Sequence, residues 1–532
     1  IVTFRQLRWV LVPAAICGAV SLTMTGFLGL MDWPVTVVSS NFISLALIIT
    51  LSLIVHLIVR YRELQVADPN RPQGALIDET LRSKFAPSFY TAATTVVSFA
   101  SLVVSDIRPV IDFGLMMVWG VVIAFCMTFL MWPTALAPFS SGSTPREESD
   151  ITHRITQTFA GLIARRGNAV LAVYALLIIA GIIGISRITV ENRFIDYFKS
   201  STEIHQGMIT IDDRLGGTTP LDVVITDEKP PESEAGGDPF ASDCDPFVED
   251  CEGAEEYRDT WFTYQKMDRL GKFHDYLDSL PETGKVMSID TTLDILAQVN
   301  GGEPLNALEL AFVPSAVPDD LKDILLTPYI SEEHDQARFS IRILETSPDL
   351  RRQALLDRIR THLTEEMGFE DDQVKLTGMT VMYNNMLQSL FDSQIKTIGI
   401  VFLAIMVMFL ILFRSIKLAL IGMAPNLIAA GSVLGLMGWL GIPLDMMTIT
   451  VAAITVGIAV DDTIHYIHRF KTEFEKDGDY LATMHRCHRS IGQAMFFTSL
   501  TIITGFSILV LSNFIPTIYF GLFTGFAMFM AL

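Results

Sequence analysis

A long internal repeat constrains the fold of this chain more than any other feature of its sequence. Residues 4–8 (Phe-Arg-Gln-Leu-Arg) reappear in related form at 413–417 (Phe-Arg-Ser-Ile-Lys), and both copies continue into long apolar stretches. Repeated apolar stretches are typical of membrane proteins whose two halves share one fold. The sequence therefore predicts a duplicated transmembrane bundle. The aligned pairs include Gly26 with Gly435, Gly29 with Gly438, Pro34 with Pro443, His56 with His465, Arg60 with Arg469 and, after a two-residue deletion, Phe99 with Phe506, Pro109 with Pro516 and Phe113-Gly114 with Phe520-Gly521.

The composition agrees with a membrane protein. Half of the residues are hydrophobic and only 18% are charged, which is unusual for a soluble domain. A helix needs roughly 20 mainly apolar residues to cross a bilayer. Such runs are expected near 10–31, 36–59, 89–106, 110–132, 168–186, 395–413, 418–440, 443–467 and 491–511, with a further run beginning at 515.

The charges are unevenly distributed along the chain. The net charge is −21, yet the short polar loops between the apolar runs are rich in Arg and Lys, and the acidic residues lie mostly between 190 and 390. Because basic loops stay in the cytoplasm, the long acidic segment is predicted to lie outside. The expected divisions are a first transmembrane bundle at 1–137, a cytoplasmic connection at 138–167, a span at 168–186, an exterior domain at 187–392 and a second bundle at 393–532. A first residue other than Met and an apolar run that ends at Leu532 predict a fragment of a longer protein.

The exterior segment alternates between strand and helix patterns. Residues 221–226 and 337–344 alternate like strands, 349–367 carries apolar residues at helical spacing, and 374–378 is a further short strand. This order predicts an α+β sandwich of the split βαβ type, similar to a porter domain. From Val381 a helix is expected to continue without a break into the span at 395, because neither Pro nor Gly interrupts it.

An acidic insertion at 227–260 interrupts the exterior domain. It is rich in Asp, Glu, Pro and Gly, a composition typical of a solvated loop. A weak calcium site is the alternative, but the spacing of its acids does not match a calcium-binding loop. Cys244 and Cys251 lie in this insertion and could form a disulfide in an oxidising compartment.

One short motif carries the chemistry. Residues 457–465 read Gly-Ile-Ala-Val-Asp-Asp-Thr-Ile-His within the apolar run 443–467. A carboxylate inside a span costs about 2.5–3.5 kcal/mol on insertion scales and usually marks an ion or proton pathway. Asp461 and His465 share a helix face, and Asp462 lies three residues from His465. We predict that Asp461, Asp462 and His465 form a proton relay, with Gly457 allowing close approach of another helix. The alternative is a set of polar residues that face water at the mouth of the bundle.

The first copy of the repeat differs at this motif. The residues aligned with Asp461 and Asp462 are Ser52 and Leu53, so only Ser52 and His56 offer polar groups at the equivalent place. Hydroxyl groups could support a proton path, although in spans they commonly satisfy backbone carbonyls instead. The predicted supporting residues are Ser52, His56, Thr498 and Thr501.

Other classes of function lack sequence support. No Gly-x-x-x-x-Gly-Lys-Ser/Thr loop is present, so ATP is not the evident energy source. No cluster has the spacing of a metal site or of a catalytic nucleophile, so we expect neither an enzyme nor a bound cofactor or metal. The acidic exterior domain argues against nucleic acid as a partner.

These residues together resemble the resistance–nodulation–division (RND) superfamily. The resemblance rests on the doubled bundle, on Gly457-x-x-x-Asp461-Asp462 followed by Thr-Ile-His, and on the exterior domain between the spans. Within the superfamily the chain looks like bacterial exporters related to the mycobacterial large membrane proteins, with hopanoid and sterol transporters as relatives. The resemblance implies proton-driven movement of hydrophobic molecules, with a relay that many relatives share between both copies. The first copy here lacks the acid, so the coupling is expected to rest on Asp461 and Asp462.

The resulting hypothesis is a proton-driven RND-type transporter that exports or shuttles a lipid-like substrate at a bacterial inner membrane. Its exterior domain would be periplasmic, its partners would be membrane lipids and a periplasmic or outer-membrane protein, and it could form a homo-oligomer. Two alternatives stay open: a lipid-binding sensor or assembly protein of the sterol-sensing type, and a proton-driven accessory factor for protein export.

Overall fold

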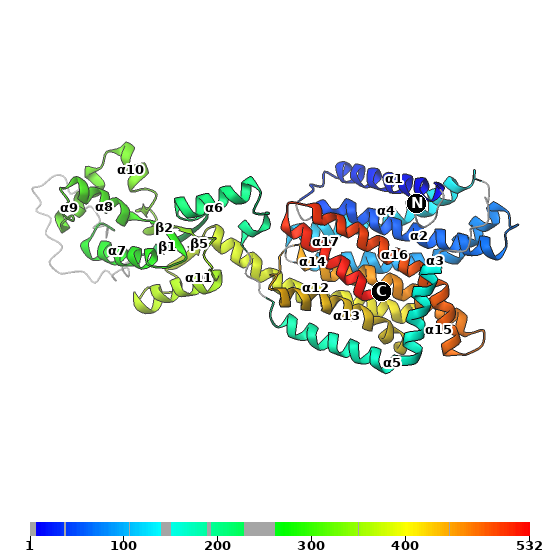
Figure 1. Cartoon of the computed structure of the whole chain (residues 1–532). Helices are drawn as coiled ribbons and strands as arrows, with labels where there is room; N and C mark the ends of the chain where they lie inside the picture. Colours follow the sequence, from blue (N-terminus) through cyan, green and yellow to red (C-terminus); the bar gives the residue numbers. More distant parts are fainter. Residues whose placement is uncertain are drawn as a thin grey trace, which may run out of the picture. The chain divides into compact units, whose positions relative to one another are not determined.

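The fold is given by a computed structural model, which describes residues 7–36, 39–105, 107–139, 150–188, 193–227, 261–348, 350–445 and 447–532. The chain forms two compact units: residues 1–192 together with 387–532, and residues 193–386 (Figure 1). The sequence analysis placed the exterior domain at 187–392. The acidic insertion, apart from Asp227, and both Cys244 and Cys251 lie outside the described residues.

The first unit is a helical bundle. Among the described residues, nine helices are long and apolar enough to cross a membrane, as the sequence predicted. Several of them are longer than the predicted apolar runs, and part of the predicted connection 138–167 belongs to a helix that begins at Asp150. The helices of this unit, which also include the shorter α15 and α17, are α1 (Arg8–Leu30), α2 (Phe42–Ala67), α3 (Gln73–Ala100), α4 (Arg108–Leu136), α5 (Asp150–Ile185), α12 (Met379–Phe413), α13 (Ile416–Leu440), α14 (Thr448–Phe474), α15 (Tyr480–Arg489), α16 (Ile491–Ser507) and α17 (Ile515–Ala531).

The two copies of the repeat share local detail as well as helix order. Before α2, the backbone N–H of Thr36 donates to Ser39 Oγ at 2.7 Å, and before α14 that of Asp445 donates to Thr448 Oγ1 at 2.8 Å. Thr36 and Asp445 are aligned residues, as are Ser39 and Thr448. These matching turns begin the two equivalent helices in the same way.

Helices of one copy cross helices of the other at close range. A Cβ added to Gly457 of α14 would lie 2.7 Å from Cβ of Ser98 on α3. At the equivalent crossing, a Cβ on Gly505 of α16 would lie 2.9 Å from Ile48 of α2. Small residues thus bring α14 against α3 and α2 against α16, as is common in membrane bundles. The predicted role of Gly457 in close helix approach fits this contact.

A glycine-lined interface joins α5 to α13. A Cβ on Gly184 would lie 2.1 Å from the carbonyl oxygen of Gly435, and one on Gly438 would lie 1.8 Å from that of Gly184. Trp439 adds a hydrogen bond from its indole Nε1 to the Ala180 carbonyl at 2.9 Å. Backbone contact of this kind leaves no room for any side chain.

We therefore expect Gly184→Leu to destabilise the bundle. Overpacking a well-packed site costs about 1–3 kcal/mol, and here the rigid backbone cannot yield. The measurement is the thermal unfolding midpoint of the purified protein in nanodiscs. Gly161→Leu is the matched control, because Gly161 lies on the same helix with no atom within 4 Å of an added Cβ. Equal midpoints for the two variants would contradict the packing account.

The second unit is an α+β domain with an antiparallel sheet of order β2-β4-β1-β5. Its strands are β1 (Thr219–Thr226), β2 (Thr283–Met287), β3 (Ile330–Ser331), β4 (Gln336–Ile343) and β5 (Val374–Thr377). Strand β4 lies between β1 and β2 and is antiparallel to both, which is the predicted split βαβ arrangement. The helices are α6 (Glu203–Leu215), α7 (Tyr264–Asp278), α8 (Ile289–Val299), α9 (Ala307–Ala316), α10 (Asp319–Leu325) and α11 (Arg352–Thr361).

The core of this domain follows the alternation of its strands. Val223 of β1 pairs with Phe339 of β4, and both side chains are fully buried. Phe339 meets Phe273 of α7 edge to face, with 4.8 Å between ring centroids. Strands β2 and β3 and the three helices α8–α10 between them were not predicted from the sequence. Figure 1 shows these helices as a group beside α7.

Candidate functional site

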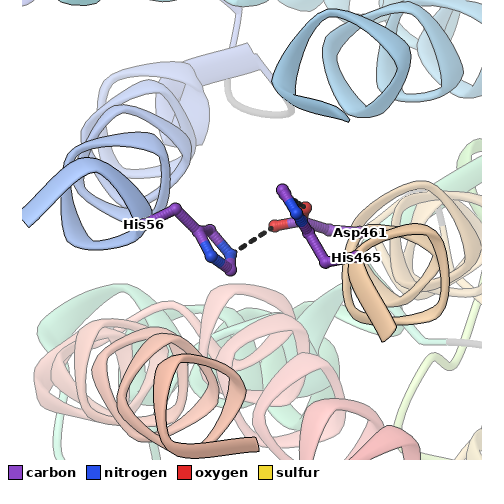
Figure 2. A group of neighbouring side chains, drawn as sticks. All are labelled: His56, Asp461 and His465. Carbon is purple, nitrogen blue, oxygen red and sulfur yellow. Dashed lines mark ion pairs between the residues drawn. The ribbon is translucent and has the colours of Figure 1, made fainter. Parts of the chain in front are cut away.

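A single carboxylate lies at the centre of the predicted relay. Asp461 of α14 points towards α2, where His56 lies opposite it (Figure 2). Its oxygen Oδ1 accepts a hydrogen bond from Thr91 Oγ1 at 2.9 Å and lies 3.2 Å from His465 Nε2. Its oxygen Oδ2 accepts from Ser52 Oγ at 3.2 Å and lies 3.7 Å from His56 Nε2. Each carboxylate oxygen therefore has one hydroxyl and one imidazole as neighbours.

The two imidazoles are aligned residues of the repeat, and they face each other. The rings of His56 and His465 stack with 4.1 Å between centroids and 20° between their planes. Ser52 and Asp461 are likewise aligned residues, 409 positions apart, and they are hydrogen-bonded. The pseudo-twofold relation between the copies thus brings equivalent positions of α2 and α14 together. One acid can serve both histidines, which gives the missing acid of the first copy a physical reason.

The histidines are buried and incompletely satisfied. His56 is 1% exposed, and neither of its ring nitrogens has a hydrogen bond within the part of the chain that the structure describes. Like charges in contact are unfavourable, so Asp461 can compensate one imidazolium but not two. The group is therefore suited to hold one mobile proton that either imidazole can carry.

Asp462 occupies a different environment. Its oxygen Oδ2 accepts from Ser499 Oγ on α16 at 3.0 Å, and its side chain is buried. No ion-pair partner for Asp462 occurs among the described residues, whereas Asp461 has two histidines. The two adjacent acids are therefore separate sites that face different helices.

Hydroxyl groups on α3 complete the surroundings of Asp461. Besides Thr91, Thr95 donates to the Gly457 carbonyl at 3.1 Å and Ser98 donates to that of Ala453 at 2.6 Å. These α3 residues were not among the predicted site residues. Their spacing could have revealed them, because 91, 95 and 98 fall on one face of a helix.

The predicted hydroxyls of α16 behave differently from those of α3. Thr498 is buried, and its hydroxyl bonds back to the carbonyls of Ala494 at 3.1 Å and Met495 at 2.9 Å. Thr501 is half-buried, and within the described residues no hydrogen bond connects it to Asp461 or Asp462. Both Ser499, at 3.0 Å, and Thr498 have side-chain contacts with Asp462.

Cavities approach Asp461 from both directions along the helices. A small cavity of about 20 Å³ is lined by Ser52, Thr91 and Asp461 together with apolar neighbours, and it is large enough for one water molecule. A larger cavity of about 370 Å³ begins at His465 and continues past Lys84 and Arg469 towards the polar ends of α2, α3 and α14. We call this end of the bundle the basic end. Water in the larger cavity would connect His465 with the basic end, and a water molecule in the small cavity would contact Asp461.

Ion pairs organise the basic end. Arg469 of α14 pairs with Glu63 of α2 at 3.3 Å, and Arg60 pairs with the same Glu63 at 2.7 Å. Beyond the span, Arg486 donates to Asp477 at 2.7 Å and lowers the pKa of that carboxyl. The Arg469–Glu63 pair links the two copies beside the larger cavity.

The same donors could also hold a metal ion. The ligand atoms of His56, Asp461 and His465 all lie within 4.8 Å of one another. Two imidazoles and a carboxylate suit a transition metal, and further ligands would have to come from water or from the neighbouring hydroxyls. No metal was expected from the sequence, and a chelator distinguishes a bound metal from a proton at this site.

Comparison with known proteins places this geometry in context. Residues 283–532 match the sequence model of the MMPL family. A protein of Methanocaldococcus jannaschii, whose name says only that it is a membrane protein, is 26% identical over 242 residues, which are 44% of this chain and 60% of that protein. The crystal structure of SecDF, a translocon-associated membrane protein from Thermus thermophilus, matches with a TM-score of 0.55 at 14% identity, covering 98% of this chain and 57% of that one.

The chain thus spans less than two thirds of the length of each of these relatives. At 14% identity the likeness to SecDF concerns the fold, which agrees with a duplicated bundle and an intervening α+β domain. The chain is a multi-pass membrane protein of the type found among RND transporters and their accessory factors. Over residues 283–532 it resembles the MMPL family, a branch of the resistance–nodulation–division superfamily.

Proposed function

We propose that this protein uses the proton-motive force to move a hydrophobic or lipid-like substrate across or out of a bacterial inner membrane. The observation that carries the proposal is the buried carboxylate of Asp461 between two stacked histidines, one from each copy of the repeat. A charged group at this depth is expensive and usually functional. No nucleotide-binding loop offers another source of energy within the sequence.

The proposed mechanism follows from the contacts of Asp461. A proton entering from the cavity at the basic end would first meet His465, whose Nε2 is 3.2 Å from Oδ1. The stacked ring of His56 offers the second carrier, 3.7 Å from Oδ2. Ser52 and Thr91 hold the carboxylate between them, and the small cavity beside them would hold the water that passes the proton onward.

Proton transfer between the histidines would change the attraction between α2 and α14. These helices belong to different copies, so a change in their contact would shift one half of the bundle against the other. Rocking of repeat halves around a central site is the way such folds give alternating access. The exterior domain would be periplasmic, and a periplasmic or outer-membrane partner or a second copy of the chain could complete the path.

The proposal is tested by flux in proteoliposomes. The full-length protein is reconstituted with a fluorescent phospholipid analogue as probe, and a pH gradient is imposed. Flux should follow the size of the gradient, fall to background with a protonophore and persist in the presence of a metal chelator. Flux that ignores the gradient would contradict proton coupling, and loss of flux with chelator would favour a metal at the histidines.

An accessory role in protein export is the second candidate. The fold likeness to SecDF, a translocon-associated protein, covers nearly the whole chain and favours it. Under this alternative the lipid probe would not move. An unfolded secretory protein would instead bind the exterior domain and stimulate proton uptake by the reconstituted protein.

A further inference from the structure

The exterior domain contains an apolar pocket of about 490 Å³ between α8, α9 and α10. Of its thirteen lining residues, all but Asn300 and Glu309 have apolar side chains. Leu308 and Phe312 of α9 form part of the rim and are 69% and 59% exposed. Val313 lies deeper and belongs to the buried core of the domain. The bottom of the pocket is therefore part of the folded core of the domain, and its rim is apolar and open to solvent.

The size of the pocket suits a small amphiphile. Ligand pockets usually measure about 300–1,000 Å³ and are mostly apolar with a few polar groups. Exposed apolar clusters on a domain that faces water mark sites of binding. The pocket lies wholly within residues 193–386, so it belongs to this domain alone.

Its chemistry excludes most charged and polar ligands. Glu309 accepts a hydrogen bond from the backbone N–H of Asn306 at 2.8 Å in the capping box of α9, so its carboxylate already has a structural partner. No Lys or Arg lines the pocket. A bound peptide would bring backbone N–H and C=O groups that need hydrogen-bond partners, and among the lining side chains only Asn300 and the second oxygen of Glu309 could supply them.

We infer that this pocket, formed by α8, α9 and α10, binds the acyl chain of the lipid-like cargo while the headgroup remains in water. An acyl chain brings no polar group into the pocket, and it gains affinity by removing methylenes from water. The inference rests on the proposed function for the identity of the cargo and adds a binding site and a substrate class. Leu305, Leu308 and Phe312 are large apolar residues that lie close together in the sequence. All three line this pocket, whereas Leu310 is buried.

A photoreactive fatty acid tests the inference. The full chain in nanodiscs is irradiated with an eighteen-carbon fatty acid that carries a diazirine in its chain, and labelled peptides are mapped by mass spectrometry. We expect the labels to gather in α8–α10. The double variant Leu308→Gln, Phe312→Gln should lose most of this label, because it makes the rim polar without touching the buried core.

The matched control is Ile204→Gln, Ile211→Gln. These residues are exposed apolar side chains on α6 of the same domain and do not line the pocket. The control should keep the full label in α8–α10. Label that is spread evenly over the domain, or that survives in the Leu308, Phe312 double variant, would overturn the inference. So would a wild-type dimer that the double variant converts to a monomer, because the pocket would then be a contact between copies.

The test separates this inference from the proposed function. Label should be unchanged in Asp461→Asn, because the pocket needs no proton relay. Proton-dependent flux without label in α8–α10 would leave the proposed function standing and remove the pocket. Label in the pocket together with flux that does not depend on the pH gradient would support the pocket and contradict the proposed proton coupling.

Discussion

Asp461→Asn should abolish proton-driven flux in proteoliposomes while leaving the fold intact. Asn keeps the size of the side chain and can still bond to Ser52 and Thr91, but it cannot balance a protonated histidine. Breaking a buried ion pair by removing one partner costs about 3–5 kcal/mol, which corresponds to roughly a hundredfold or more in rate if it falls on the coupling step. The measurement is the initial rate of probe movement under a fixed pH gradient.

Two further variants make this result specific. Asp112→Asn is the matched control, because Asp112 is also a buried aspartate in a span but pairs with Arg108 at 3.1 Å near the start of α4. It should keep near wild-type flux. Asp462→Asn should have an intermediate effect, since Asp462 contacts Ser499 rather than the histidines. Full flux in Asp461→Asn would remove the relay from the mechanism.

The membrane fold could be predicted from the sequence because its signals are local. A run of about 20 apolar residues can hardly be anything but a span. Strict alternation at 221–226 and 337–344 indicates strands, and their buried side chains include Leu221, Val223, Phe339 and Ile341. The weaker elements escaped prediction. Strand β2 is only five residues long and contains Gly284, and its register shifts beside that residue, so its alternation is hidden.

The site was only half predictable. The cost of charge in a span identifies Asp461 and Asp462 from the sequence alone, and i, i+4 spacing adds His465. The partners from other helices depend on how the helices cross, which no local pattern records. Thr91 lies 370 residues from Asp461 and reaches it only because Gly457 lets α3 and α14 approach.

The repeat contained more information than its alignment suggested. Ser52 in place of an acid indicated an asymmetric relay, and so the first copy was expected to contribute little. In the structure the aligned positions Ser52 and Asp461 are in contact, so a second acid would place two carboxylates together at the pseudo-twofold axis. Neighbouring carboxylates repel each other when both are ionised. A single acid between the two copies therefore avoids this repulsion.

This symmetry predicts that the carboxylate can be moved to the other copy. In Ser52→Asp, Asp461→Ser the acid would project from α2 instead of α14. Ser52 Oγ is 3.2 Å from Asp461 Oδ2, so the moved carboxylate would occupy nearly the same place. It would stand four residues before His56, as Asp461 stands four residues before His465, and the small cavity beside Ser52 gives it room.

We expect Asp461→Ser alone to lose proton-driven flux. The double variant should have about tenfold more flux than Asp461→Ser, which corresponds to a coupling energy of about 1.4 kcal/mol between the two positions. Recovery should be incomplete, because Thr498, the residue aligned with Thr91, has its hydroxyl turned back to its own helix at 2.9 Å from the Met495 carbonyl. Thr50→Asp, Asp461→Ser is the control for an acid placed elsewhere on α2, and it should give no recovery. Thermal unfolding of each variant separates loss of coupling from loss of fold. If the double variant folds well but has no more flux than Asp461→Ser, the position of the carboxylate between the histidines is not sufficient for coupling. The coupling would then depend on the surroundings of residue 461 on α14.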